Sequence, residues 1–390
     1  MNMMKLKLFC PYWILSLFAL FVFSAHAEDY PKCRLGAPWL AEDSVHINAH
    51  GGNVILHEGV YYWFGEHRTP RSFTTQVGVN CYASTDLLHW KHTSVALPVS
   101  EEETSDIVRG CIIERPKVVY NRQTDKFVMW FHLELKGRGY EAARCGVAIS
   151  ETPEGPYTFL RSFRPHAEVW PMNMTSEEIA EAQKLNLSEY SEWWTPTWYE
   201  ALEKGLFVWR DWKGGQMSRD MTVFVDEDGK AYHIYSSEDN LTLHIAELSD
   251  DYLSHTGKYI RLAPGGHNEA PTIFKQDGVY WLITSGCTGW EPNEARMFSA
   301  KNIMGPWEKH SNPCVGPMAE KTFGGQGTFI FRIGEEKSDS LFFMADVWNP
   351  RHLNDSRHLW IPIRFQDGKP VIEWPQGAEP IKREFRRKRR

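Results

Sequence analysis

Five polar side chains occupy comparable places in a repeated pattern, and their types suit acid-base chemistry. Glu114, Asp220, Glu269 and Gln326 each stand at the opening of a strand-like run, and Glu66 follows another such run. A cluster of carboxylates splits the pKa values of its members, which supplies a protonated acid beside ionised neighbours. We therefore expect these residues to share one catalytic site. Taken alone, each acid would more often pair with an arginine and hold a loop.

The stretch Gly265–Phe274 shows how the chain positions such a side chain. Glu269 lies where a glycine-containing loop enters an apolar run, and catalytic groups are commonly held on loops by a rigid scaffold. The Asp277-Gly278 pair that follows predicts a hairpin turn into a second strand at 279–283. The unit is therefore a loop, an acid, a strand, a turn and a strand.

The same unit occurs five times along the chain. Its openings lie at 51–56, 114–120, 219–225, 268–274 and 326–331, and each is followed by a turn and an aromatic-rich strand. A period of about fifty residues falls in the range of propellers. We predict an all-β fold, a single five-bladed β-propeller, whose radial closure leaves few sheet edges exposed. The first strand of each blade lines the central channel, so the openings should converge on one mouth.

One segment, at about 163–216, breaks the period. It contains a helix-like run, Ser176–Lys184, for which Ser176 is the expected N-cap. Trp193, Trp194 and Trp198 follow it. Two interpretations remain open: a decoration with its own small core, or a lid or wall of the substrate site.

The two ends of the chain are predicted to lie outside the propeller. Residues 1–27 combine a basic head, a short apolar run and a small-x-small cleavage signal, which predicts a signal peptide and export to the periplasm or medium. The apolar run is too short for a membrane span. The propeller then occupies 28–381, and the basic segment 382–390 is expected to be a solvated tail.

Composition narrows the function further. The formal net charge of -7 and the absence of a broad basic face argue against nucleic-acid binding. The six cysteines after the signal peptide show no Cys-x-x-Cys spacing, so no zinc site is predicted, and buried free thiols and disulfides both remain open. The 17 tryptophans would suit the stacking of sugar rings, although aromatic residues more often form the core.

Two motifs carry a resemblance to a known family. Ser218–Thr222, followed by Val225–Tyr232, and Asn268–Phe274 resemble motifs of family 43 glycoside hydrolases. The likeness extends over nearly the whole mature chain. It implies a five-bladed propeller and an inverting hydrolase in which Glu269 matches the general acid and Asp220 the residue that tunes the pKa of that acid.

The position of the family's general base differs in this chain. The Asp-Pro opening of the first blade is replaced by His50–Asn53, which contains no carboxylate. That loss, together with Glu66, Glu114 and the motif around Gln326, resembles the exo-β-1,3-galactanase branch, in which a Gln replaces the base. In that branch Tyr140, Thr288 and Asp220 match contacts to the terminal galactose.

The resemblance implies an exo-acting enzyme that releases galactose from the non-reducing end of β-1,3-galactan, such as an arabinogalactan backbone. An arabinofuranosidase or xylosidase of the same family is the alternative, and a sugar-binding propeller that has lost catalysis is another. No cofactor is required, and calcium is left open because some family members hold it in the channel. We expect a monomer.

Overall fold

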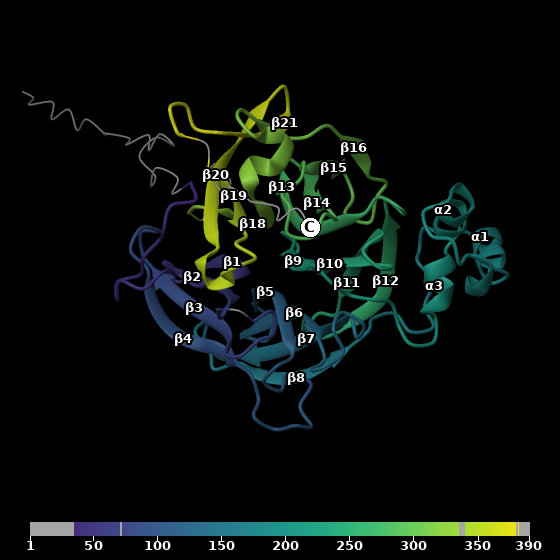
Figure 1. Ribbon diagram of the computed structural model, residues 1–390, viewed down its shortest axis with the longest axis horizontal. Coiled ribbons are helices and arrows are strands. Elements are labelled where there is room, and N and C mark those ends of the chain that lie inside the picture. Colours follow the sequence, from purple (N-terminus) through teal and green to yellow (C-terminus); the bar gives the residue numbers. More distant parts are fainter. Residues whose placement is uncertain (1–34, 71, 335–339, 380, 382–390) are drawn as a thin grey trace, which may run out of the picture. The chain divides into compact units, whose positions relative to one another are not determined.

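The computed structural model describes residues 35–70, 72–334, 340–379 and 381, which form five β-sheets around a central channel (Figure 1). The predicted all-β, five-bladed propeller is therefore confirmed. The predicted signal peptide, 1–27, and the basic tail, 382–390, lie outside the described residues.

Each of the first four blades is a four-stranded sheet built from consecutive strands, and the fifth adds a short strand that pairs in parallel with β21. The strands are β1 (His50–His57), β2 (Val60–Glu66), β3 (Gly78–Ser84) and β4 (Lys91–Pro98); β5 (Ile112–Asn121), β6 (Lys126–Glu134), β7 (Arg144–Ser150) and β8 (Thr158–Phe163); β9 (Met221–Val225), β10 (Ala231–Ser237), β11 (Thr242–Leu248) and β12 (His255–Leu262); β13 (Asn268–Gln276), β14 (Val279–Gly286), β15 (Arg296–Ala300) and β16 (Glu308–His310); and β17 (Cys314–Val315), β18 (Gln326–Arg332), β19 (Leu341–Val347), β20 (Arg357–Gln366) and β21 (Lys369–Glu373).

The innermost strands β1, β5, β9, β13 and β18 correspond to the five predicted openings. The Asp277-Gly278 pair forms the predicted hairpin turn, since both residues have positive φ, as the favoured two-residue turn requires. The starts of the inner strands therefore lie at one end of the channel and these turns at the other. The loops β2–β3, β6–β7, β10–β11 and β14–β15 return to the first end, which we call the mouth.

A local irregularity at the mouth distinguishes four inner strands. The pairing register shifts between His50 and Asn53 in β1, between Glu114 and Lys117 in β5, between Glu269 and Thr272 in β13, and next to Gln326 in β18. Such β-bulges bend a strand and redirect its side chains. Three of the four shifts lie next to a predicted site residue, namely Glu114, Glu269 or Gln326.

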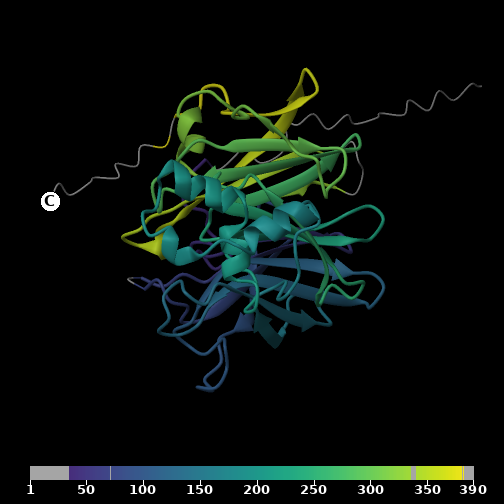
Figure 2. The same ribbon diagram turned by 90° about the vertical axis from the view of Figure 1, so that its right-hand side faces the viewer.

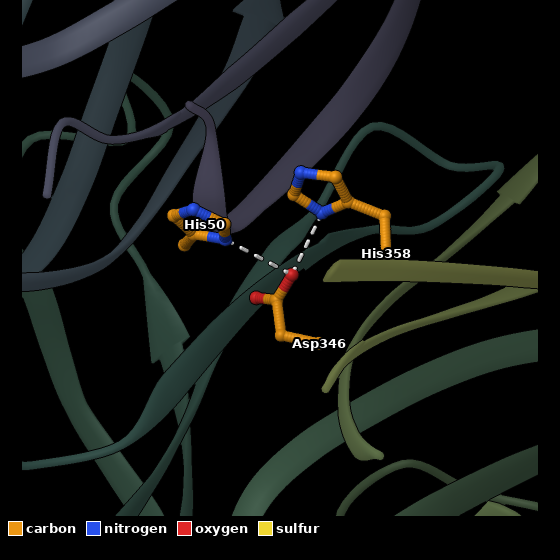
Figure 3. Close-up of side chains that lie close together, drawn as sticks. All are labelled: His50, Asp346 and His358. Carbon is orange, nitrogen blue, oxygen red and sulfur yellow. Dashed lines mark hydrogen bonds and ion pairs between the residues drawn. The ribbon is translucent and has the colours of Figure 1, made fainter. Parts of the chain in front are cut away.

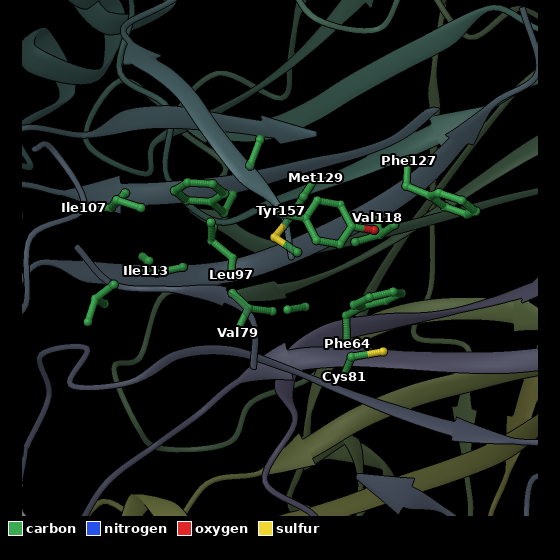
Figure 4. Packing of buried hydrophobic residues seen from close by; sticks show 14 of the residues in the cluster. Phe64, Val79, Cys81, Leu97, Ile107, Ile113, Val118, Phe127, Met129 and Tyr157 are labelled. Carbon is green, nitrogen blue, oxygen red and sulfur yellow. The ribbon is translucent and has the colours of Figure 1, made fainter. Parts of the chain in front are cut away.

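Apolar side chains fill the spaces between neighbouring sheets. Between the first two blades, Phe64 and Cys81 face Val118 and Met129, and all four are fully buried (Figure 4). Strands that face a neighbouring sheet on each side are apolar on both faces, which explains the nearly continuous burial of β2 and β6. This packing fixes the angular position of each blade, and so of each opening.

The ring closes through packing between the first and last blades. Each of these blades is complete in itself, and β1 lies against β18. Trp39, which precedes the first blade, packs edge-on against Trp63 of that blade at 5.3 Å and against Trp360 of the last blade at 4.7 Å. Gly36 N also donates to His358 O at 3.2 Å. The N-terminal segment therefore joins the two blades.

The insertion lies between β8 and β9, as predicted, at the outer edge of the third blade beside β12 (Figures 1 and 2). Its helices are α1 (Ser176–Ala182), α2 (Pro196–Glu203) and α3 (Leu206–Arg210), and the 3-10 turn η1 (Leu187–Glu189) lies between α1 and α2. Two further 3-10 turns, η2 (Ala319–Gly324) and η3 (Leu353–Asp355), belong to the last blade. The predicted N-cap Ser176 is wrong by one residue. Thr175 caps α1, because its hydroxyl accepts from Glu178 N while the Glu178 carboxylate accepts from Thr175 N.

The insertion has a small core of its own. Trp198, Leu202 and Phe207 pack together with Leu241 of the β10–β11 loop. The guanidinium of Arg261 also donates to the carbonyl oxygens of Leu202 and Glu203. These contacts attach the insertion to the third blade.

The described cysteines are free thiols: Cys81, Cys111, Cys145, Cys287 and Cys314. All but Cys287 are buried. The sixth, Cys33, lies outside the described residues. Within the described residues, every helix is too short or too polar to span a bilayer.

Candidate active site

A cavity of about 310 Å³ opens at the mouth of the channel. Six of the seven predicted site residues line it, and each of the five blades contributes. The lining residues are Glu66, Arg68, Glu114, Arg115, His132, Tyr140, Arg219, Asp220, Asn240, Glu269, Gly289, Trp290, Gln326 and Trp348. A larger hollow of about 620 Å³ lies at the opposite end of the channel, lined by the far halves of the inner strands and none of the predicted site residues.

Glu269 lines the cavity in surroundings that favour its protonated form. Its carboxylate accepts a hydrogen bond from Asn240 Nδ2 at 2.7 Å and lies beside the Cys287 thiol. Burial raises the pKa of Glu269 to about 7, and the nearby negative charge of Asp220 acts in the same direction. The carboxyl group is therefore protonated over much of the range below neutral pH, as proton donation requires.

Asp220 sits between Glu269 and Arg115. Its Oδ2 forms an ion pair with Arg115 NH2 at 2.9 Å and accepts from Ala270 N at 3.1 Å. The second contact joins Asp220 to the backbone immediately after Glu269, so the two carboxyl groups are held at a fixed separation. The role of Asp220 in tuning the pKa of the acid stays a prediction.

Gln326 is held by three hydrogen bonds. Its Oε1 accepts from Arg115 NH2 at 2.6 Å and from Trp348 Nε1 at 3.0 Å, and its Nε2 donates to Ser285 Oγ at 3.1 Å. Both lone pairs of the carbonyl oxygen are therefore occupied, whereas one N–H of the amide remains for another acceptor. The same Arg115 guanidinium also donates to Gly327 O at 3.0 Å.

Glu66 and Glu114 share Arg68 but differ in their surroundings. Arg68 pairs with both carboxylates, and Arg115 N donates to Glu66 Oε1 at 2.8 Å. Burial raises the pKa of Glu66 to about 7, although the charge of Arg68 opposes this and that of Glu114 adds to it. Tyr140 OH donates to Glu114 Oε1 at 2.9 Å.

His132 accounts for the contrast between the two acids. Its Nδ1 lies 3.3 Å from Glu114 Oε2 and its Nε2 2.9 Å from Glu134 Oε1. Burial alone would raise the pKa of Glu114, but the hydrogen bond from His132 and the charge of Arg68 outweigh it and hold that pKa below its usual range. The surroundings of Glu114 therefore favour its ionised form, whereas those of Glu66 favour its protonated form.

Space for the Glu66 carboxylate is provided by a glycine. A Cβ on Gly51 would lie 2.3 Å from Glu66 Oε1, and Gly51 has a φ of +64°, which favours glycine. The first blade thus carries no side chain at this point of its opening. The carboxylate of Glu66, from the end of β2, fills the space instead.

Thr288 lies beside the cavity and is the predicted site residue that does not line it. It is exposed, its Oγ1 donates to Glu291 O at 2.5 Å, and it accepts from Asn293 Nδ2 at 2.7 Å. These bonds stabilise the β14–β15 loop, whose Gly289 and Trp290 do line the cavity.

Two groups of described residues have the composition of metal ligands. Glu114, His132 and Asp220 form one, but Arg68 and Arg115 already pair with its carboxylates. The other is His50, Asp346 and His358 (Figure 3).

In this second group the Asp346 carboxylate contacts both histidines. His358 Nδ1 lies 2.8 Å and His50 Nδ1 3.5 Å from its Oδ1, and Gly51 N donates to its Oδ2 at 2.6 Å. Asp346 therefore links the start of β1 to the last blade, which is a structural role. Neither group was predicted as a metal site.

Several lining residues were not predicted from the sequence, above all Arg68, Arg115, His132, Asn240 and Trp348. Arg115 is one of the arginines expected from the sequence to pair with an acid and hold a loop. Its place directly after Glu114 at a blade opening was the available signal. The others lie on loops or second strands, where the repeat gave no signal.

Comparisons with known proteins show which family this chain resembles. Residues 190–370 match glycosyl hydrolases family 43. A family 43 β-1,3-galactosidase solved with galactodeoxynojirimycin is 61% identical over 87% of this chain and 98% of its own, with a TM-score of 0.85. An exo-β-1,3-galactanase from Phanerochaete chrysosporium, solved with β-1,3-galactotriose, is 31% identical over 86% of this chain and 65% of its own, with a TM-score of 0.68.

A third relative is more distant. The β-D-galactofuranosidase xynD of Aspergillus niger is 29% identical over 145 residues, which are 36% of this chain and 40% of that enzyme. The match therefore spans less than half of that protein. By contrast, the β-1,3-galactosidase solved with galactodeoxynojirimycin is matched over 98% of its length at 61% identity. On that ground, this chain belongs to glycoside hydrolase family 43.

Proposed function

We propose that this glycoside hydrolase is an exo-acting, inverting β-1,3-galactosidase that removes galactose from the non-reducing end of β-1,3-galactan, such as an arabinogalactan backbone. The observation that carries the proposal is that Glu269 and Gln326 line the same small cavity. The likeness to β-1,3-galactosidases of the same family supports the choice of sugar and linkage.

Glu269 donates the proton in this mechanism. Its pKa of about 7, raised by burial and by Asp220, keeps it protonated until the glycosidic oxygen leaves. As the C1–O bond breaks, the proton passes to the leaving oxygen, and the leaving sugar departs with a free hydroxyl. General acid catalysis of this kind contributes about 10²–10⁴-fold.

Gln326 holds the attacking water in this mechanism. An inverting glycosidase needs a water on the face of the sugar opposite the leaving group. The amide of Gln326 offers a water two groups, its carbonyl oxygen as an acceptor and its N–H as a donor. Because that oxygen already accepts from Arg115 and Trp348, we assign the contact to the remaining N–H of the amide, which donates to the water oxygen.

Glu66 takes the water's proton. An amide with a saturated carbonyl oxygen is a poor base, and Glu114 is held as a strongly stabilised anion by His132 and Arg68. Burial raises the pKa of Glu66 to about 7. Arg115 joins Glu66 to Gln326, because its backbone N–H donates to the Glu66 carboxylate and its guanidinium donates to the Gln326 carbonyl oxygen. The water oxygen bonds to C1, one of its protons passes to Glu66, and both acids then re-equilibrate with solvent.

Recognition of the terminal galactose is assigned to the polar residues of the same cavity. Glu66, Glu114 and Asp220 present carboxylates, and Tyr140 presents a hydroxyl, to a space of about 310 Å³. Arginine and histidine partners fix the orientation of these groups, so their side chains lose little conformational entropy when the sugar binds.

A substrate panel tests the proposal. We expect release of galactose from β-1,3-galactobiose and from debranched β-1,3-galactan, and little or no release from aryl α-arabinofuranosides or xylosides. Hydrolysis of the aryl arabinofuranoside with none of galactobiose would contradict it. Tight binding of galactobiose without turnover would identify a sugar-binding propeller instead.

We also propose export of the enzyme by the predicted signal peptide and a monomeric state. Fractionation of the producing cell, with detection of the chain in the cytoplasm alone, would contradict the first. Light scattering of the purified protein tests the second.

A further inference from the structure

Trp193 and Trp194 of the insertion form an exposed aromatic pair. Trp193 is 41% and Trp194 57% exposed, and no other tryptophan of the described residues is exposed. Both rings pack at 5.1 Å against the fully buried ring of Trp198, which anchors them. Large apolar rings such as these are ordinarily buried. A pair that is anchored and yet exposed therefore indicates a binding surface.

The backbone of Trp194 supports the same conclusion. Its φ is +71°, a left-handed conformation that is unfavourable for a bulky residue. Strained residues of this kind persist only where the surrounding structure holds them, and they gather at functional sites. Here the strained residue carries a large ring that is 57% exposed.

A short chain of contacts joins this pair to the acid. Trp194 packs on His267 at 5.2 Å, and Tyr199 OH lies 3.2 Å from His267 Nε2. His267 N donates to Leu241 O at 3.3 Å, and the preceding Asn240 donates to Glu269. His267 is also only two residues before Glu269, on the loop that enters β13. The aromatic pair therefore lies on the same side of the mouth as the acid.

The stereochemistry of inversion makes that side the leaving-group side. The water enters at Gln326, and the leaving oxygen meets Glu269 on the opposite face of the terminal sugar. The rest of a galactan chain must therefore extend past Glu269 and Asn240, away from Gln326. None of the residues that line the cavity comes from the insertion, so its exposed rings are available to later sugars and not to the terminal one.

We propose that Trp193 and Trp194 form a stacking surface for the leaving-group part of a β-1,3-galactan chain, several sugars beyond the bond that is cleaved. This assignment rests on the proposed function. It gives the insertion a binding role in place of the wall or lid considered from the sequence. The surface recognises the apolar faces of neutral hexopyranose rings and favours long substrates over disaccharides.

Steady-state kinetics on two substrates test this inference. Trp194→Ala and the double change Trp193→Ala with Trp194→Ala should lower kcat/KM on debranched β-1,3-galactan by about three- to tenfold, as the loss of an aromatic contact implies. Hydrolysis of β-1,3-galactobiose should remain as in the unchanged enzyme. Trp194→Phe should retain most of the activity on galactan.

Phe365→Ala provides a matched control. Phe365 is 41% exposed, like Trp193, but lies in the last blade near the β20–β21 turn and packs on Phe274. It should leave both activities unchanged. A thermal unfolding temperature within experimental error of the parent's shows that each variant is folded.

The outcomes separate this inference from the proposed function. Equal loss on galactan and galactobiose, or no loss on galactan, would overturn the stacking surface while leaving the galactosidase assignment intact. Failure of the unchanged enzyme to hydrolyse either substrate would overturn the proposed function, and the stacking surface with it.

Discussion

Replacement of Glu269 by Gln should increase stability while it abolishes most activity. In the folded protein the pKa of Glu269 is raised from 4.5 to about 7, by burial and then by Asp220. Below pH 4.5 the carboxyl group is protonated in both the folded and the unfolded chain. Between pH 4.5 and about 7 only the unfolded chain releases the proton. The free energy of unfolding therefore falls as the pH rises, and the decrease is complete above pH 7.

The size of this effect follows from the shift. One pKa unit corresponds to about 1.4 kcal/mol, so the rise from 4.5 to about 7 lets Glu269 lower the free energy of unfolding by at most about 3–4 kcal/mol above neutral pH. Glu269→Gln retains the shape and the hydrogen bond from Asn240 Nδ2 but cannot ionise. We expect the variant to be more stable than the parent by about 2–3 kcal/mol at pH 8, with little difference at pH 4.5.

Urea unfolding at the two pH values measures this difference. Glu192→Gln, an exposed change on the insertion, is the control and should give the same small difference at both. In parallel, kcat on β-1,3-galactobiose should fall about 10²–10⁴-fold in Glu269→Gln, and less for substrates with activated leaving groups. Equal stability of parent and variant at pH 8, or hydrolysis at the parental rate, would refute the assignment of Glu269 as a partly buried, protonated acid.

Three further changes probe the rest of the site. Gln326→Ala should lower kcat and, with added azide, yield α-galactosyl azide; a raised KM with kcat intact would make it only a binding residue. Gly51→Ala places a Cβ 2.3 Å from Glu66 Oε1, so kcat should fall at least about tenfold; parental kcat would contradict the role of that carboxylate. Arg115→Met removes the donors to Gln326 and Asp220 and should cost about 10² in kcat. Arg115→Lys should not restore it, because the fork of donors is lost, and a lysine variant with parental kcat would refute this positioning role.

The architecture could be predicted from sequence because it repeats. Each blade opens with a turn-flanked apolar strand, and Asp-Gly and aromatic signals recur at similar spacing, so five weak signals supported one another. The same repetition placed Glu114, Asp220, Glu269 and Gln326 at equivalent points, and the structure brings all four into one cavity.

The remainder depends on contacts between blades, which a repeat does not encode. Arg115 reaches Asp220 in the third blade and Gln326 in the fifth, and its role became visible only when those strands were neighbours. The hydrogen bond from Trp348 that saturates the Gln326 oxygen has the same origin.

The insertion shows the limit of local patterns. Its helices are short, at seven, eight and five residues, and only the first had a clear periodic signal. Isolated helices of this length are marginal in water, so contacts with Leu241 and Arg261 of the third blade must stabilise them. Sequence predicted a helix but could not show that the tryptophans lie outside the cavity.

The anomeric form of the first product tests the central claim most directly. Proton NMR of β-1,3-galactobiose during the first minutes of hydrolysis distinguishes the α from the β anomer of the released galactose before mutarotation. A mechanism with Glu269 as acid and a water held at Gln326 predicts α-galactose first, at a rate lowered in both Glu269→Gln and Gln326→Ala. Initial β-galactose would mean retention through a covalent intermediate and would contradict the account.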